Sequence, residues 1–144
     1  MCALPSSPAT ASPWVTDLKY SGSCHCGAVA FEVEAPSPLV VQDCNCSICV
    51  KSGFLHLIVP KSRFQLLHGE DRLTAYTFNT GVAKHLFCAT CGMKPFYVPR
   101  SNPDGIDVNV RCLEPVPTGM VVEPFDGQNW EANGPSLAHL SKPD

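Results

Sequence analysis

Hydrophobic and polar residues alternate in short runs from Lys19 onward, as they do in half-buried β-strands. In the clearest run, Val29, Phe31 and Val33 alternate with small or acidic residues. Other short apolar or aromatic runs predict strands at 39–41, 54–59, 73–78, 83–87, 96–98 and 106–110. Only 128–132 and 136–140 have a brief helical pattern. Elements this short do not suit a parallel α/β fold, so the pattern predicts a compact all-β domain with little helix.

The two ends of the chain lack this alternation. Residues 1–17 are rich in Pro, Ser and Ala and predict a flexible arm, with Trp14 as an anchor and Cys2 as a free thiol. We expect the domain to occupy 18–135 and a C-terminal tail to occupy 136–144. No signal-peptide pattern and no membrane-spanning apolar run is visible, so we expect no membrane association. The default location is the cytoplasm, with the nucleus as an alternative.

Charge and cysteine content narrow the function classes. The chain has ten Lys and Arg residues and thirteen Asp and Glu residues, which gives a net charge of −3. This charge argues against nucleic-acid binding by this chain alone. The chain has nine cysteines among 144 residues. In a reducing compartment, clustered cysteines are more often metal ligands than disulfides, and an odd number suits disulfides poorly. The composition therefore favours a small domain held together by metal.

Seven of the cysteines fall into three clusters. The clusters are Cys24-His25-Cys26-Gly27, Cys44-Asn45-Cys46-Ser47-Ile48-Cys49 and Cys88-Ala89-Thr90-Cys91-Gly92. A structural zinc site takes four protein ligands, whereas a catalytic one takes three and leaves a position open. Seven ligands can therefore be divided into four and three.

The first and third clusters predict the four-ligand site. Cys88 and Cys91, followed by Gly92, have the spacing of a zinc-knuckle turn that supplies two ligands. Cys24 and Cys26 are two residues apart, so on a strand they would point to the same side and could supply the other two. Such a saturated site would connect distant parts of the chain and stabilise the fold.

The second cluster predicts the three-ligand site. Cys44, Cys46 and Cys49 lie in one short segment that we interpret as a loop, which could cap one face of a zinc ion and leave the other face to water or substrate. The alternative is a closed site in which His56 or His25 is the fourth ligand. Cys112 stands alone, and we expect it to pack in the core.

These motifs resemble a known family. The three cysteine clusters, in this order, resemble the glutathione-dependent formaldehyde-activating enzyme family over about residues 18–130, and three further stretches resemble its centromere protein V branch. Those stretches are Ile58-Val59-Pro60, Tyr76-Thr77-Phe78-Asn79-Thr80 and Phe96-Tyr97-Val98-Pro99-Arg100-Ser101-Asn102-Pro103. The resemblance implies small stacked antiparallel sheets and two zinc ions per chain. It places the structural zinc on Cys24, Cys26, Cys88 and Cys91, and the catalytic zinc on Cys44, Cys46 and Cys49.

The resemblance also implies a reaction. The family adds glutathione to formaldehyde and is classed among the carbon–sulfur lyases, so we expect a small-molecule thiol, glutathione, as substrate. The resemblance to its centromere protein V branch adds association with chromosomes and microtubules. In that branch a long basic, Pro-rich N-terminal region precedes the domain, whereas this chain has no Lys or Arg before Lys19. The alternative function is therefore a non-catalytic, zinc-bearing binding module that docks on chromosomal or cytoskeletal proteins. Unpaired sheet edges would allow a homodimer.

Several polar residues are candidates for the chemistry. His56, in the apolar run Leu55-His56-Leu57, is the expected general acid and base or a partner of a metal ligand. His25 would orient the four-cysteine site. The cationic residues beside the motifs could bind the carboxylates of glutathione; they are Lys51, His85, Lys94 and Arg100. The turn predicted at 100–105 could line the substrate pocket.

Overall fold

Short β-strands make up most of the regular structure, as the sequence pattern predicts. The computed structural model describes residues 16–142. Its strands are β1 Thr16–Ser23, β2 Ala30–Ser37, β3 Val40–Cys44, β4 His56–Pro60, β5 Phe64–His68, β6 Leu73–Tyr76, β7 His85–Cys88, β8 Phe96–Tyr97, β9 Gly105–Asn109 and β10 Val121–Phe125. Its α-helices are α1 Ser47–Ser52 and α2 Trp130–Asn133, and 3₁₀ segments lie at Lys61–Arg63, Glu70–Arg72, Val110–Cys112, Gly127–Asn129 and Gly134–Ser141. The predicted arm at 1–17, with Cys2 and Trp14, lies outside the described residues except for its last two, which begin β1.

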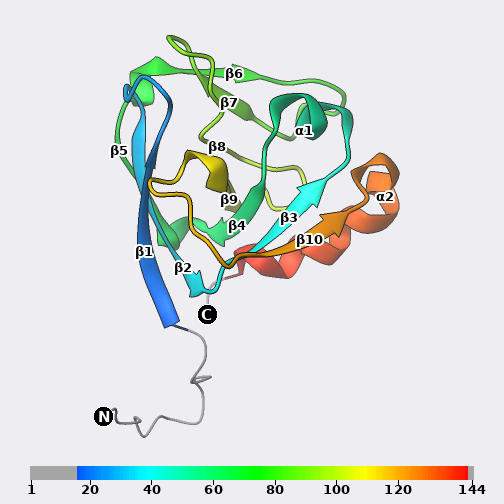
Figure 1. Ribbon diagram of the computed structural model, residues 1–144. Helices are drawn as coiled ribbons and strands as arrows, with labels where there is room; N and C mark the ends of the chain where they lie inside the picture. The colour runs from blue at the N-terminus through cyan, green and yellow to red at the C-terminus, as the bar shows by residue number, and fades with distance from the viewer. Residues whose placement is uncertain (1–15, 143–144) are drawn as a thin grey trace, which may run out of the picture.

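The strands form three small sheets. The first has the order β1-β2-β5, the second β10-β3-β4-β9-β8, and the third pairs β6 with β7. All pairings are antiparallel except that of β10 with β3, which is parallel. In Figure 1, β1 and β2 lie on the left, β3 and β10 run side by side at the lower right, and β6 and β7 cross the top. None of the helices among residues 16–142 has the length and apolar character needed to cross a membrane.

The alternation along β2 builds the main core. Phe31, Val33 and Ala35 are buried, while the glutamates between them face outward. The Phe31 ring packs against Phe64 at 5.5 Å and against Phe96 at 5.8 Å between ring centroids. Phe64 belongs to the first sheet and Phe96 to the second, so this core joins the two sheets.

The central position of β4 explains why its sequence does not alternate. All five residues of β4 are buried, because β3 and β9 flank the strand in its sheet and side chains cover it on both faces. His56 is the first residue of this strand and is therefore held in the interior of the protein. A histidine in such a place needs polar partners.

Four of the strands and α-helices in residues 16–142 do not match a range predicted from the sequence, namely β1, α1, β5 and β10. Helix α1 has only six residues, too few to display a helical period. Strand β5 follows a 3₁₀ turn that interrupts its apolar run. Strand β10 contains Pro124 and is almost entirely exposed, so its sequence carries no burial pattern. The brief helical segments predicted near the C-terminus are confirmed, as α2 and the flanking 3₁₀ segments.

Asn102 fastens the C-terminal segment to the turns at 99–105. Its side chain is fully buried, and its Nδ2 donates to Leu137 O at 2.9 Å, Ala138 O at 3.3 Å and Ser141 Oγ at 2.9 Å. Ser141 Oγ in turn donates to Asp104 Oδ1 at 2.6 Å. The segment that carries Leu137 lines the cavity described below, so this buried amide also fixes one wall of the site.

Substituting Asn102→Ala should destabilise the fold, because three acceptors lose a buried donor. We expect a loss of about 1–3 kcal/mol in the free energy of unfolding, measured by urea denaturation. The matched control is Asn129→Ala, which removes an exposed hydrogen bond to Asp126 and should cost less than about 0.5 kcal/mol. Equal stability of the two variants would contradict this reading of Asn102.

Candidate functional site

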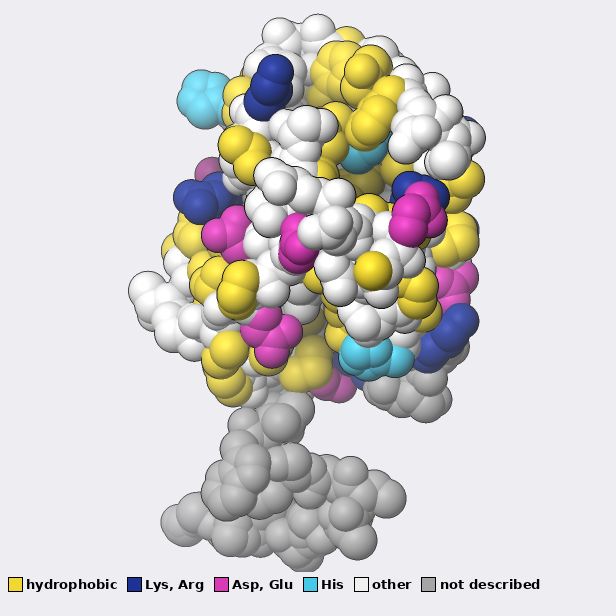
Figure 2. Space-filling model, turned by 90° about the vertical axis from the view of Figure 1, so that its right-hand side faces the viewer, with side chains coloured by type: hydrophobic (Ala, Val, Ile, Leu, Met, Phe, Trp, Pro, Cys, Tyr) yellow, Lys and Arg dark blue, Asp and Glu magenta, His cyan; other side chains and the backbone are white. Residues whose placement is uncertain are grey.

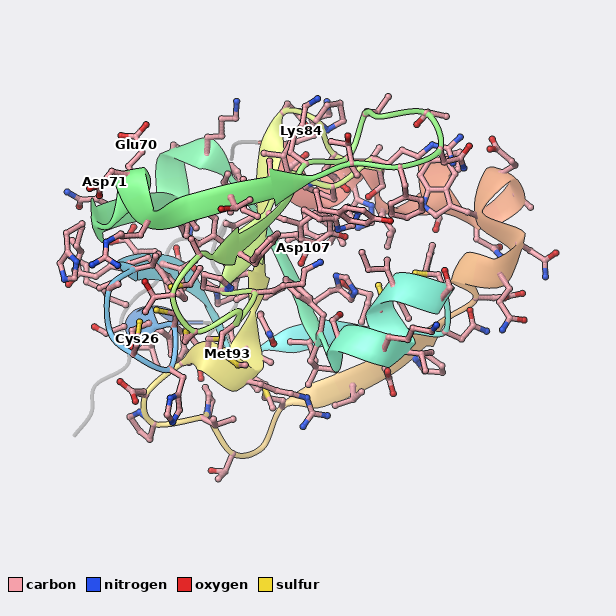
Figure 3. All side chains as sticks on the ribbon, turned by 90° about the horizontal axis from the view of Figure 1, so that it is seen from above. Cys26, Glu70, Asp71, Lys84, Met93 and Asp107 are labelled. Carbon is pink, nitrogen blue, oxygen red and sulfur yellow. The ribbon has the colours of Figure 1, made fainter. Side chains whose placement is uncertain are left out.

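The structure gathers the seven clustered cysteines into two groups. The ligand atoms within each group all lie within 4.8 Å of one another; the groups are Cys24, Cys26, Cys88 and Cys91, and Cys44, Cys46 and Cys49. This is the four-and-three division predicted from ligand counting. Seen from above, Cys26 lies toward one edge of the molecule, near Met93, whereas the buried Asp107 lies in its interior (Figure 3).

The four-cysteine group joins two turns. Cys24 and Cys26 flank a turn after β1, so the prediction that they share a strand was wrong: the Gly27 amide donates to Cys24 O at 3.2 Å and turns the chain between them. The Sγ atom of Cys26 lies 3.7 Å from that of Cys24 and 3.7 Å from that of Cys88. His25 is exposed in the same turn.

The backbone around this group favours thiolates. Amides point at the sulfurs, with Val29 N 3.4 Å from Cys24 Sγ and Thr90 N 3.4 Å from Cys88 Sγ. Burial opposes ionisation of Cys91, but hydrogen bonds from the backbone of Cys26 and Met93 lower its pKa to about 6. Such a set of sulfurs suits a thiophilic cation such as zinc.

The three-cysteine group lies at a junction of strand and helix. Cys44 ends β3, Cys46 is the N-cap residue of α1, and Cys49 lies within the helix. The predicted loop is therefore confined to the residues between the strand and the helix. Gly53 ends α1 with a φ of 66°, in the left-handed region that favours glycine.

Close contact among the three sulfurs gives the three thiols different pKa values. Hydrogen bonds from the thiols of Cys44 and Cys49 lower the pKa of Cys46 to about 2. The hydrogen bond to Cys46 raises the pKa of Cys44 to about 11, and the contacts with Cys44 and Cys46 raise that of Cys49. One sulfur thus ionises readily while its neighbours keep their protons. Full ionisation of the group requires a cation, and the donor set fits zinc.

The segment after β10 closes over the three-cysteine group. Parallel pairing with β3 brings Gly127 so close that a Cβ there would lie 2.4 Å from Cys44 Sγ and 3.1 Å from Cys46 Cβ. Asn45 fixes this segment, because its Oδ1 accepts from Gln128 N at 3.0 Å. The role of Gly127 could not be predicted from the sequence, because it depends on a long-range strand pairing.

His56 connects the three-cysteine group to a buried carboxylate. Its Nε2 lies 3.0 Å from Cys49 Sγ, and its Nδ1 lies 2.6 Å from Asp107 Oδ2. The side chains of His56 and Asp107 are 6% and 2% exposed, so the pair is shielded from solvent. Asp107 was missed in the sequence analysis, although an acidic residue inside the predicted strand 106–110 was a signal for it.

A cavity of about 430 Å³ opens beside the three-cysteine group. Its lining includes the three cysteines together with His56, His85, Tyr97, Arg100, Ser101, Asp107 and Trp130. Figure 2 shows a histidine recessed between hydrophobic side chains on this face of the molecule. The cavity is the size of a small-ligand site, and its wall combines apolar and aromatic side chains with polar groups that include the thiols, two histidines and Arg100.

The cationic candidates occupy different places. His85 lies in the cavity wall with its Nδ1 3.0 Å from Lys94 Nζ, and burial, together with the Lys94 charge, lowers its pKa to about 4. Arg100 lies at the cavity with its guanidinium 3.8 Å from the Trp130 ring centroid and forms an ion pair with Glu131 at 2.5 Å. Lys51 is exposed on α1 and does not line the cavity.

Two comparisons with known proteins, a family model and a curated relative, name the same family. Residues 19–125 match the family model described as "Glutathione-dependent formaldehyde-activating enzyme". A Halomonas elongata protein named "Putative glutathione-dependent formaldehyde-activating enzyme" is 33% identical over 78 residues, which are 49% of this chain and 50% of that protein. The match thus spans about half the length of this curated relative. A crystal structure of a Rhodobacter sphaeroides protein is similar with a TM-score of 0.64 and 39% identity, over 72% of this chain and 98% of that one.

Substituting Gly127→Ala should impair metal binding at the three-cysteine group only. The added Cβ would collide with Cys44 Sγ, so the sulfurs could not keep their spacing. We expect native mass spectrometry of zinc-loaded protein to show about one ion fewer per chain than in the wild type, at unchanged occupancy of the four-cysteine group.

The control for this prediction is Gly105→Ala. Its Cβ would be equally crowded, 2.5 Å from Ser141 Cβ, but it lies against the C-terminal segment and not against the cysteines. This variant should lose stability without losing zinc. Full zinc content in Gly127→Ala would show that the segment after β10 does not shape the group.

Proposed function

The chain belongs to the glutathione-dependent formaldehyde-activating enzyme family, and from this premise we propose that it joins a thiol to a small aldehyde and catalyses the reverse cleavage. The proposed thiol is glutathione and the proposed aldehyde is formaldehyde, which would make the protein a carbon–sulfur lyase resembling S-(hydroxymethyl)glutathione synthase. The observation that carries the proposal is the group of three thiols at the wall of a cavity large enough for a small ligand.

We assign one zinc ion to each cysteine group. Cys24, Cys26, Cys88 and Cys91 would saturate a structural ion, while Cys44, Cys46 and Cys49 would leave a fourth position for the substrate on the cavity side. When bound there, zinc would stabilise the substrate sulfur as a thiolate at neutral pH. Seven thiols in this state require a reducing compartment, and we therefore place the enzyme in the cytoplasm.

The reaction itself needs few groups from the chain. The thiolate sulfur forms a bond to the carbonyl carbon, the electron pair of the C=O bond moves to oxygen, and the oxygen gains a proton. The reverse reaction breaks the same C–S bond and returns the aldehyde. The chain must therefore hold the thiolate, exclude competing water with the apolar cavity wall and stabilise negative charge on oxygen.

The contacts of His56 favour one of its two predicted roles. Both ring nitrogens are already engaged, Nδ1 with Asp107 and Nε2 with Cys49. No ring nitrogen remains to exchange a proton with substrate in the cavity. We therefore assign His56 to positioning: Asp107 accepts a hydrogen bond from Nδ1 and fixes the ring, and Nε2 contacts the sulfur of Cys49.

Arg100 is the proposed anchor for glutathione, which carries two carboxylates. Its guanidinium lies at the cavity and packs on Trp130. Within residues 16–142 its one ion-pair partner is Glu131, whose side chain is 80% exposed. A substrate carboxylate could replace this exposed partner and form a bidentate pair with the same guanidinium. Such an anchor would set the affinity for the thiol without touching the reacting atoms.

Substituting Cys46→Ser should abolish the activity and release one zinc ion while the fold is retained. The reason is that Cys46 belongs to the three-cysteine group alone. The measurements are zinc content by native mass spectrometry, the circular dichroism spectrum, and the rate of adduct formation from glutathione and formaldehyde above the spontaneous background.

The control for this prediction is Cys112→Ser, which changes a cysteine outside both groups and should keep both ions and full activity. If the zinc content were one per chain and unaffected by Cys46→Ser, with no glutathione adduct, the chain would be a zinc-bearing binding module and not an enzyme.

Substituting Arg100→Met should raise the KM for glutathione by about tenfold or more with little change in kcat, because one charge-assisted carboxylate contact is lost. Methionine keeps the packing on Trp130. The same variant should convert 2-mercaptoethanol, which has no carboxylate, at the wild-type rate. Arg111→Met, at an exposed position outside the cavity, is the matched control. An equal effect on both thiols would exclude Arg100 as a carboxylate anchor.

A further inference from the structure

We propose that His85 donates a hydrogen bond from Nε2 to the aldehyde oxygen, and that Lys94 is a positioning residue that fixes the proton on that nitrogen. This inference rests on the proposed thiol–aldehyde activity. As the sulfur attacks, the carbonyl oxygen acquires negative charge and needs a donor. His56 has no free nitrogen for this task, so the donor must be another group in the cavity wall.

The ring of His85 is held rigidly in the cavity wall. His85 begins β7, and two aromatic rings stack on its side chain. Tyr97 stacks on it at 4.7 Å with an interplanar angle of 15°, and Phe78 stacks on it at 5.4 Å with an angle of 25°. These two contacts hold the plane of the ring, and its edge remains the part that can donate to a ligand.

Lys94 determines which ring nitrogen carries the proton. Lys94 Nζ lies 3.0 Å from His85 Nδ1. An ammonium group can only donate, so Nδ1 must accept, and a neutral ring then carries its proton on Nε2. Burial lowers the pKa of His85 to about 4, and the Lys94 charge acts in the same direction, so the ring stays neutral at pH 7.

Two aromatic rings contact the ammonium group of Lys94. Its Nζ lies over both rings, 5.4 Å from the centroid of Phe54 and 5.0 Å from that of Tyr97. Burial lowers the pKa of Lys94, and the charges of Cys49, Asp107 and Cys46 oppose this shift only in part. Among residues 16–142, no carboxylate lies within ion-pair distance of its Nζ. The ammonium group can therefore donate a hydrogen bond to His85 Nδ1 without competition from a carboxylate in these residues.

The backbone of Lys94 is also fixed. Its carbonyl oxygen accepts from Asn109 Nδ2 at 3.1 Å. The Oδ1 atom of Asn109 accepts in turn from Leu55 N at 3.3 Å and from Arg111 N at 3.1 Å. A buried asparagine thus connects Lys94 to β4 and β9, the strands that carry His56 and Asp107.

The Nε2 atom of His85 is available to a ligand. It has no hydrogen-bond partner among the described residues. Only Gln42 Oε1 and Asp107 Oδ1 are fully buried without a partner in residues 16–142, so Nε2 keeps some exposure. His85 lines the same cavity as the three cysteines, so this N–H donor belongs to the residue set that a ligand in the cavity would meet.

The step balances without a proton leaving His85. The thiol gives its proton to water when it ionises, its sulfur then forms the C–S bond, and the C=O electron pair moves to oxygen. His85 Nε2–H stabilises that oxygen through a hydrogen bond, and water returns one proton to it. Thiol plus aldehyde thus gives the adduct with no net change in protons, and a neutral imidazole never has to ionise.

The first experiment locates the proton directly. In zinc-loaded, ¹⁵N-histidine-labelled full-length protein, long-range ¹H–¹⁵N spectra distinguish a ring protonated at Nε2 from one protonated at Nδ1, and His85→Phe identifies the signal of His85. We expect the Nε2–H form in the wild type and in Lys94→Arg, which keeps a donor-only cation. Lys94→Met, which keeps the packing on Phe54 and Tyr97, should lose this preference. A wild-type ring protonated at Nδ1 would overturn the proposal.

The second experiment measures catalysis with glutathione and formaldehyde. His85→Phe keeps the stacking but removes the donor, and we expect kcat to fall about 100-fold or more while the Kd for glutathione changes less than about twofold. His85→Gln, which can place an amide N–H near Nε2, should recover part of the rate. Zinc content and thermal unfolding check that each variant is folded.

The outcomes separate this inference from the proposed function. An active wild type together with an equally active His85→Phe would overturn the role of His85 and leave the lyase activity standing. A wild type with no activity, fully loaded with zinc, would overturn the proposed function, and the role of His85 as donor would fall with it. Loss of rate in His85→Phe with partial rescue in His85→Gln supports both.

Discussion

Mutual repulsion of neighbouring thiolates is the constraint on which this structure depends. Two unit charges 4.8 Å apart repel by roughly 3–4 kcal/mol at an effective dielectric constant near 20. The chain keeps its sulfurs at this spacing by backbone geometry: a turn after β1, a turn after β7, and the junction of β3 with α1. Sulfurs at this spacing can all ionise only when positive charge lies among them, and a thiophilic metal supplies that charge.

The two cysteine groups affect the same cavity in different ways. The three-cysteine group lines it, and the four-cysteine group fixes the turn next to one of its walls. Cys88 ends the strand that His85 begins, and Lys94 follows Cys91 by three residues. The four-cysteine group joins the turn after β7 to the turn after β1. It therefore also fixes the positions of His85 and Lys94, which we assign to the binding of the aldehyde oxygen. A group whose sulfurs do not line the cavity can in this way determine the geometry of its wall.

The sequence pattern predicted the features that depend on residues close together in the chain. The alternation at Val29, Phe31 and Val33 was confirmed because β2 has one buried face, and the spacing of the cysteine motifs predicted their grouping. The closing segment at Gly127 could not be predicted, since it depends on the parallel pairing of β3 with β10, in which partners such as Val40 and Val121 lie 81 residues apart, and since β10 has no burial pattern. Cys24 and Cys26 were assigned to a strand because residue spacing alone does not reveal the turn at Gly27.

The two histidines of the cavity show how a partner decides the role of a side chain. His56 and His85 are both buried, and their different roles follow from their partners and not from the residues beside them in the sequence. Asp107 can only accept from His56 Nδ1, which leaves Nε2 toward the sulfur of Cys49. Lys94 can only donate to His85 Nδ1, which leaves the Nε2–H available to a ligand. An acceptor at Nδ1 of His56 and a donor at Nδ1 of His85 thus lead to different roles. His56 contacts a cysteine ligand, whereas His85 is the proposed hydrogen-bond donor to the aldehyde oxygen.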